Sequence, residues 1–167
     1  IENNEGKQYA TNYEYNGLNK LTKITDALGN IQDFTYDSLG RRLSTEDLHT
    51  PNDKTFGIHN FTYDDSSNII SETNQNGQVT NYSYDKLKRI LTEDFIGKNG
   101  IETTYSYDSC SIGMGKLCSV TSTNIITSYN YDQLGNIIKE NKKIENKDYS
   151  TLFLYDWQGN LLTLTYP

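Results

Sequence analysis

Short runs of alternating apolar and polar residues fill this chain, and most contain an aromatic residue two positions before a tyrosine. Successive copies of this aromatic triplet lie 21 to 27 residues apart. Residues i and i+2 of a β-strand share a face, so each triplet places two rings on one side and a small polar residue on the other. The pattern predicts a series of short strands, which contain Tyr13/Tyr15, Phe34/Tyr36, Phe61/Tyr63, Tyr82/Tyr84, Tyr105/Tyr107, Tyr129/Tyr131 and Phe153/Tyr155.

A turn motif, Asp-x-x-Gly, follows many of the triplets. Aspartate at the first position of a turn accepts hydrogen bonds from backbone amides two residues on, and glycine at the fourth adopts a positive φ without a Cβ clash. The motif therefore predicts a type I turn with a bulge. Its clearest copies pair Asp37 with Gly40, Asp132 with Gly135 and Asp156 with Gly159.

Such a three-residue hairpin loop places the tyrosine opposite the residue six positions later. Those residues are mostly apolar, and an aromatic facing an aliphatic side chain across two strands contributes roughly 0.2 to 1 kcal/mol. The expected pairs are Tyr15 with Leu21, Tyr63 with Ile69, Tyr84 with Ile90, Tyr131 with Ile137 and Tyr155 with Leu161.

A second turn signal closes many units, as at Asp26 to Gly29 and Asn74 to Gly77, so each repeat comprises two strands. One hairpin is marginal in water, whereas stacked hairpins cover each other's aromatic face. We therefore expect an all-β fold: residues 1–167 form a single segment of about seven hairpin units in a curved, mostly antiparallel sheet. Departures from the pattern predict irregular turns or loops, at Asn16, Ser67, Lys88, 112–115 and 49–59.

Composition and charge narrow the range of possible functions. Only 34% of residues are apolar while 14 are tyrosine, and the net charge is -7. This charge disfavours a nucleic-acid partner and gives no attraction to an anionic membrane surface. No apolar run approaches the roughly 18 residues of a membrane span, and the N-terminus lacks a secretory signal pattern. We expect the chain to be a piece of a longer protein.

The repeats resemble the YD repeats of the Rhs family, whose unit reads approximately Tyr-x-Tyr-Asp-x-x-Gly-Arg-Leu. The matching stretches are 34–41, 129–136 and 153–160, and the resemblance extends over essentially the whole chain. It implies a segment of an Rhs-like β-shell, the hollow wall found in bacterial toxins and in animal teneurins. The implied partners are the remaining repeats of the parent protein and an enclosed C-terminal effector, and the implied location is secreted or at the cell surface.

The repeated turn aspartates have a catalytic alternative, since a glycosidase uses a pair of carboxylates. Catalysis needs one specialised pair, whereas turn capping needs one aspartate per turn, so recurrence favours capping. The spacings of known calcium loops are absent. We therefore expect no enzyme activity, no catalytic residue, no metal and no cofactor.

Two smaller clusters leave alternatives open. Cys110 and Cys118 flank an inserted turn and are either joined in a disulfide or are two free thiols. His49 and His59, with Asp53 between them, lie in the longest insertion and are either a solvated loop or part of a surface metal site.

Trp157 lies inside a turn and is a candidate for stacking on a sugar ring. The leading function is accordingly a non-catalytic scaffold that encloses an effector, and the alternative is a carbohydrate-binding module of the cell surface. A weaker third hypothesis is a glycan-cleaving propeller with paired repeats as blades. Exposed strand edges also predict homo-oligomers.

Overall fold

The regular structure of the chain is entirely β. The computed structural model describes residues 2–4, 7–98 and 100–167, and none of these residues lies in a helix. Within these ranges there is accordingly no helix long and apolar enough to cross a membrane. The strands are β1 (Glu2–Asn4), β2 (Lys7–Tyr9), β3 (Asn12–Tyr15), β4 (Leu21–Thr25), β5 (Ile31–Tyr36), β6 (Arg42–Glu46), β7 (Ile58–Tyr63), β8 (Ile69–Thr73), β9 (Val79–Tyr84), β10 (Ile90–Phe95), β11 (Thr103–Tyr107), β12 (Leu117–Ser122), β13 (Ile125–Tyr131), β14 (Ile137–Ile144), β15 (Lys147–Tyr155) and β16 (Leu161–Thr165).

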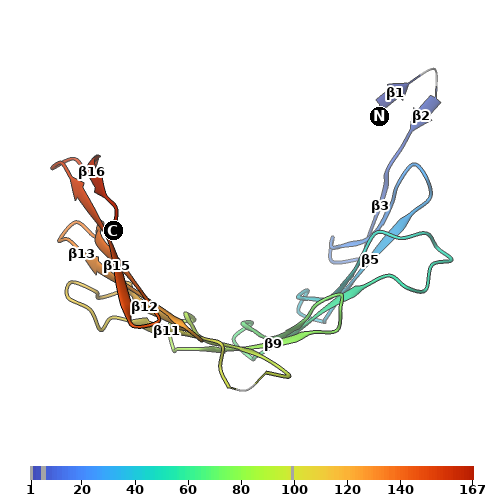
Figure 1. The fold of residues 1–167 in the computed structure, drawn as a ribbon. Helices are drawn as coiled ribbons and strands as arrows, with labels where there is room; N and C mark the ends of the chain where they lie inside the picture. Colours follow the sequence, from blue (N-terminus) through green and yellow to red (C-terminus); the bar gives the residue numbers. More distant parts are fainter. Residues whose placement is uncertain (1, 5–6, 99) are drawn as a thin grey trace. The chain divides into compact units, whose positions relative to one another are not determined.

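The chain divides into two compact units, Ile1–Asn81 and Tyr82–Pro167, with the boundary inside β9. In the first unit β1 and β2 form a separate two-stranded sheet, and β3 to β9 follow one another in sequence order. Neighbouring strands in this series are antiparallel, from the pairing of β3 with β4 to that of β8 with β9 (Figure 1).

The second unit continues the same arrangement from β9 to β16, with each strand hydrogen-bonded to the next (Figure 1). Because consecutive strands run in opposite directions, alternate turns lie at opposite ends of the strands. The turns that follow the aromatic triplets therefore all lie at the same end of the strands. The predicted all-β fold of consecutive hairpins in a curved antiparallel sheet is confirmed.

The predicted register is confirmed for four of the five expected pairs, and the pairing of Tyr84 with Ile90 stays a prediction. Tyr15 lies opposite Leu21, Tyr63 opposite Ile69, Tyr131 opposite Ile137 and Tyr155 opposite Leu161, each with a bulge beside the tyrosine. In the fifth hairpin the insertion lengthens the loop, so Tyr107 lies opposite Leu117.

Burial of the triplet rings varies along the sheet. Phe34 is only 8% exposed because β5 has a neighbour on each side, whereas Tyr13 on the terminal strand β3 is 55% exposed. The expectation that all triplet rings form a core is thus wrong at Tyr13 and Tyr15. No described side chain is fully buried, since the sheet of each unit has a single layer and neighbouring side chains supply its only cover.

Three tyrosine hydroxyls each connect a hairpin to the preceding one. Tyr36 donates to the carbonyl oxygen of Leu21 (2.8 Å), Tyr63 to that of Arg42 (2.7 Å) and Tyr131 to that of Leu117 (2.6 Å). Each acceptor belongs to the residue that lies opposite the previous triplet tyrosine. The tyrosines therefore set the spacing of successive hairpins as well as covering their apolar face.

Candidate functional site

The Asp-x-x-Gly turns are built by local hydrogen bonds. One carboxylate oxygen of Asp37 accepts from the amides of Leu39 and Arg41, both at 2.9 Å, and Gly40 lies at a φ of 76°. Asp132 and Asp156 make the same two bonds, and Gly135 and Gly159 also have positive φ. Every one of these aspartates thus closes its own turn.

Replacement residues preserve this geometry where the motif departs from its consensus. Asn16 accepts from the amides of Leu18 and Lys20 as an aspartate would. Ser67 and Lys88 take the glycine position with φ values of 66° and 63°. The turn is therefore specified by its backbone shape, and it tolerates a non-glycine residue at the cost of some strain.

The Gly159→Ala variant tests this strain. A Cβ at Gly159 would meet no atom within 4 Å, so the positive φ of 84° is the main penalty. We expect the free energy of unfolding to fall by about 1 kcal/mol, measured by urea denaturation. Gly17→Ala is the control, because Gly17 also has open space around it but no positive φ. An equal loss in both variants would contradict the argument.

Hydrogen bonding also lowers the pKa of the turn carboxylates. At Asp132 the side-chain amide of Asn136, together with the backbone amides of Asn136 and Leu134, lowers the pKa despite some desolvation. The side chain and amide of Asn160 do the same for the pKa of Asp156. A pKa that is lower in the folded state means that folding favours the ionised form of the aspartate side chain.

Stability should consequently depend on acid pH. An aspartate pKa that is depressed on folding contributes stability above its unfolded value near 4, and this contribution is lost as pH falls through the folded value. We expect a steady urea midpoint from pH 7 to 5 and a decline from pH 4 to 2. The double variant Asp132→Asn/Asp156→Asn should decline less, because asparagine keeps an acceptor oxygen, as Asn16 does, without titrating. Asp65→Asn, at an exposed turn position, is the control, and three identical pH profiles would refute the assignment.

A basic side chain links each of several turns to the next one. Arg41 pairs with Asp37 of its own turn at 2.6 Å, donates to the carbonyl oxygen of Asp64 at 2.9 Å and lies over the ring of Tyr63. A planar guanidinium suits this arrangement because it donates in several directions and stacks on aromatic faces. Arg41 thus spans two consecutive hairpins.

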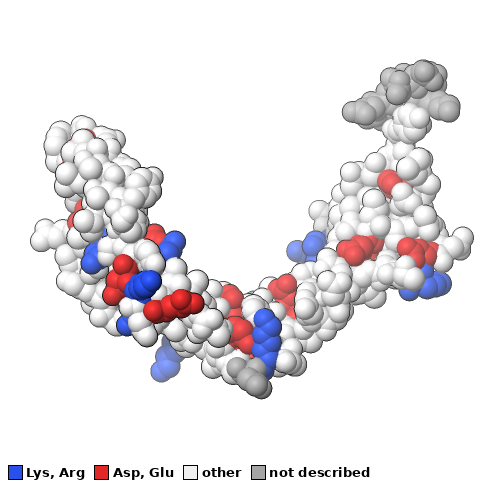
Figure 2. Space-filling model, in the orientation of Figure 1, with Lys and Arg blue, Asp and Glu red and all other residues white. Residues whose placement is uncertain are grey.

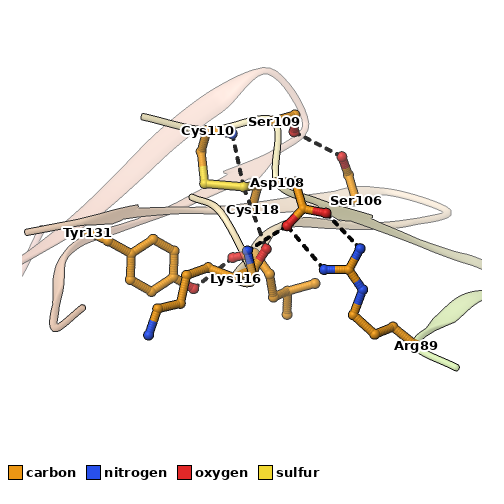
Figure 3. The surroundings of a disulfide bond; sticks show 10 residues. Arg89, Ser106, Asp108, Ser109, Cys110, Lys116, Cys118 and Tyr131 are labelled. Carbon is orange, nitrogen blue, oxygen red and sulfur yellow. Dashed lines mark hydrogen bonds and ion pairs between the residues drawn. A yellow bond between two sulfur atoms is a disulfide. The ribbon is translucent and has the colours of Figure 1, made fainter. Parts of the chain in front are cut away.

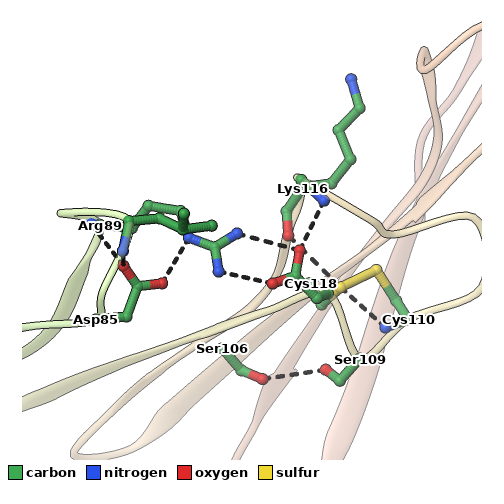
Figure 4. Close-up of polar contacts among 10 residues, drawn as sticks. Asp85, Arg89, Ser106, Ser109, Cys110, Lys116 and Cys118 are labelled. Carbon is green, nitrogen blue, oxygen red and sulfur yellow. Dashed lines mark hydrogen bonds and ion pairs between the residues drawn. A yellow bond between two sulfur atoms is a disulfide. The ribbon is translucent and has the colours of Figure 1, made fainter.

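Arg89 makes the corresponding bridge in the second unit (Figure 4). Its Nε contacts Asp85 at 2.7 Å, and its two terminal nitrogens contact both oxygens of Asp108 at 3.1 and 2.6 Å. The Arg89 hydrogen bond, with that from the Gly115 amide, lowers the pKa of Asp108. Asp108 departs from the geometry of the other turn aspartates, because the insertion lengthens its loop: its carboxylate accepts from the Gly115 amide of that loop and from Arg89.

The inserted loop is closed by a disulfide between Cys110 and Cys118, whose Cα atoms are 5.4 Å apart (Figure 3). Gly113 is buried beneath it. A Cβ at this position would come within 2.7 Å of the Cys110 carbonyl oxygen and 2.8 Å of the Cys118 sulfur. The loop therefore requires glycine here for close approach, although its φ is not in the left-handed region.

The two histidines of the longest insertion make separate contacts with different residues. His49 is buried, its ring stacks on Phe56 at 3.7 Å, and its Nδ1 donates to the carbonyl oxygen of Asp47. His59 lies 2.6 Å from a carboxylate oxygen of Glu72, while Asp53 accepts from Thr55. Among the described residues, no group of three or more His, Cys, Asp or Glu side chains is arranged to hold a metal ion.

Trp157 is 85% exposed at the second position of its turn. It is one of several large apolar side chains at the turns that follow the triplets. The leucines at the third position of other turns, Leu18, Leu39, Leu87 and Leu134, are also highly exposed. A ring in this position can stack on a ligand, and its role in sugar binding remains a prediction.

Comparisons with known proteins extend the description. The family model described as RHS Repeat matches residues 10–55 and 63–94. The tRNA3(Ser)-specific nuclease WapA of Bacillus spizizenii is 29% identical over 172 residues, which cover 93% of this chain and 7% of that protein.

Solved structures share the fold. A mutant of the Photorhabdus luminescens Tc holotoxin pore superposes with a TM-score of 0.78 at 20% identity, and the structure described as TcdB2-TccC3-TEV with a TM-score of 0.77 at 21% identity. Each match covers 95% of this chain and 9% of the other. The chain thus spans less than a tenth of the length of these proteins.

Proposed function

Because this chain belongs to the Rhs-repeat proteins, we propose that it is a non-catalytic section of wall in a longer toxin or surface protein of that family. The proposal rests on one observation, the hydrogen bonds that join successive hairpins. Arg41 and Arg89 donate to the following hairpin. The hydroxyls of Tyr63 and Tyr131 donate to the preceding hairpin. The turn aspartates are used in closing and linking turns, which supports a structural role for them.

The proposed wall encloses an effector located elsewhere in the parent protein. Its support is the likeness to TccC3-containing structures and to a nuclease whose matched stretch is only 7% of its length. We assign the catalytic part of such a protein to the remainder, since this stretch is filled by hairpin repeats.

The disulfide supports an extracellular location. Disulfides persist in oxidising compartments and are rare in the bacterial cytosol. A wall section carrying the Cys110–Cys118 bond therefore suits a secreted or surface-exposed protein.

Two measurements test the proposal. The chain should show no turnover of tRNA or glycan substrates, and activity that disappears in Asp132→Asn would overturn the non-catalytic assignment. In the full-length protein, Phe34→Asp should open the wall and speed protease digestion of the C-terminal region. Leu28→Asp, at an exposed site, should leave the digestion rate unchanged. Equal digestion of wild type and Phe34→Asp would contradict enclosure.

A carbohydrate-binding module is the second candidate, and it is favoured by the exposure of Trp157. An exposed indole can stack on a sugar ring. Specific binding on a glycan array that is lost in Trp157→Ala would support this function. Binding that persists in the variant, or no binding, would reject it.

A further inference from the structure

The loop that joins β11 to β12 carries hydrogen bonds to the hairpins on both sides. At its start, the Asp108 carboxylate accepts from the two terminal nitrogens of Arg89, in the preceding hairpin, at 3.1 and 2.6 Å (Figure 4). Just after its end, the carbonyl oxygen of Leu117 accepts from the hydroxyl of Tyr131, in the following hairpin, at 2.6 Å. Two junctions between hairpins therefore depend on the shape of one loop.

Lys116 adds a second contact with the following hairpin. Its Nζ donates to the carbonyl oxygen of Gly135 at 3.5 Å and lies 5.7 Å from the centre of the Tyr131 ring. In the regular turns the equivalent groups are held by a short loop that its own aspartate closes. This loop is longer, and the disulfide between Cys110 and Cys118 closes it (Figure 3).

The disulfide fixes the positions of both acceptors. Cys110 lies two residues after Asp108, and Cys118 directly follows Leu117, so one covalent bond ties the two ends of the loop together. Asp108 has a φ of 65°, a conformation that residues other than glycine rarely adopt and that the closed loop maintains. Without the bond, Asp108 is free to return to a negative φ, which moves its carboxylate away from Arg89.

The two sulfur atoms of the bond differ in exposure and in hydrogen bonding. Cys118 is only 4% exposed, whereas Cys110 is half-buried, so an attacking thiolate reaches the Cys110 sulfur more readily. The amide nitrogen of Cys110 lies 2.9 Å from the Cys118 sulfur and donates to it. This donor stabilises the negative charge that develops on Cys118 as it leaves, and a better leaving group speeds thiol–disulfide exchange.

Reduction by a small monothiol such as glutathione uses this asymmetry. The first thiolate attacks the Cys110 sulfur, the sulfur–sulfur bond breaks, and Cys118 leaves with the electron pair. A second thiolate attacks the glutathione sulfur of the mixed disulfide, and Cys110 leaves in turn. The two cysteine thiolates take up the two protons that the thiols released. Two thiols are thus oxidised to one glutathione disulfide, while the protein disulfide is reduced to two thiols.

The surface charge of the second unit does not repel such a reductant, although glutathione is an anion. Residues 82–167 contain nine Lys and Arg against ten Asp and Glu, a net charge of -1. On the face shown in Figure 2, the acidic and basic side chains of this unit are interspersed. A surface without a strong field of one sign leaves the approach of an anion unhindered.

We propose that the Cys110–Cys118 bond is a redox switch, which a small monothiol opens and whose opening releases the junctions with both neighbouring hairpins. The switch itself depends only on the contacts of this loop. Its consequence rests on the proposed function: a wall section is closed in an oxidising compartment and loosens at these two junctions in a reducing one.

Urea denaturation of two tyrosine variants tests the release of the junctions, in the oxidised full chain and after reduction by glutathione. Tyr131→Phe keeps the ring but loses the hydroxyl that reaches Leu117, so it should lower the urea midpoint of the oxidised protein. Reduction should at least halve this shift, because the acceptor is then already displaced. Tyr63→Phe is the matched control: its hydroxyl donates to Arg42 within the first unit, so its shift should be the same in both redox states.

Equal shifts for Tyr131→Phe in the two redox states would overturn the proposal, because the disulfide would then stabilise its own loop alone. So would a reduced chain without a cooperative unfolding transition, since a local switch leaves the other hairpins folded. Failure of the proposed scaffold function would show separately, as substrate turnover or as unchanged digestion of Phe34→Asp, and neither result alters these midpoints.

Mass spectrometry tests the order of attack. A brief exposure of the folded chain to glutathione, stopped with acid, should leave the mixed disulfide on Cys110. An adduct on Cys118, or a bond that excess glutathione does not reduce, would overturn the switch.

Discussion

Replacing Phe34 with alanine is expected to lower the free energy of unfolding by about 3 kcal/mol, near the lower limit for a buried aromatic residue. The ring is 8% exposed and Arg42 lies over it at 4.9 Å, so truncation leaves a gap that a single-layered sheet fills only in part. Urea denaturation followed by circular dichroism measures the loss.

Tyr13→Ala is the matched control for this prediction. Tyr13 holds the same place in its triplet as Phe34 but is 55% exposed on the terminal strand of the sheet. Its loss should be below about 1 kcal/mol, because little apolar surface returns to water. Equal losses at both positions would show that ring burial does not stabilise the hairpins.

Removing the disulfide should have the second largest effect. The double variant Cys110→Ser/Cys118→Ser is expected to lose about 2.5 kcal/mol, because the bond closes a short loop that is otherwise free in the unfolded chain. A thiol reductant should produce the same loss in the wild type.

The comparison with reductant separates the bond from the side chains. The double variant should not respond to reductant, since no other cysteine is present. Reduction of the wild type without a change in the urea midpoint would show that the loop does not need its bond. Hydrogen exchange at the Gly115 amide, which donates to Asp108, should quicken with the loss of the disulfide.

The hairpins and their register could be predicted because their determinants are local. A tyrosine, a turn and a residue six positions on lie within one short stretch, and turn chemistry fixes which residues face each other. Tyr131 opposite Ile137 is such a case.

Contacts between hairpins could not be derived in this way. The reach of Arg41 to Asp64 and of Arg89 to Asp108 depends on the twist and spacing of strands that are 19 to 23 residues apart in sequence. An arginine four positions after a turn aspartate was the available signal, and its partner was not evident. The antiparallel backbone pairing of His49 with Ile31 could not be predicted for the same reason, since it joins an insertion to a distant strand.

The structure of the inserted loop could not be predicted from the repeat pattern either. Gly113 is required by close approach to the disulfide, and Asp108 departs from the geometry of the other turn aspartates at a φ of 65°. Both follow from packing within one irregular loop, which the repeat pattern does not describe.

The two sets of inter-hairpin bonds point in opposite directions along the chain. Arg41 reaches forward to the third hairpin, while Tyr63 reaches back from it to the carbonyl oxygen of Arg42. A gene duplication that inserts one whole two-stranded repeat would supply a new forward donor and a new backward donor together. The hydrogen bonds could then form at both junctions of the inserted repeat. Insertion of half a repeat would reverse strand direction and leave each donor without its acceptor. Such a protein can lengthen by whole repeats during evolution without redesigning its existing junctions.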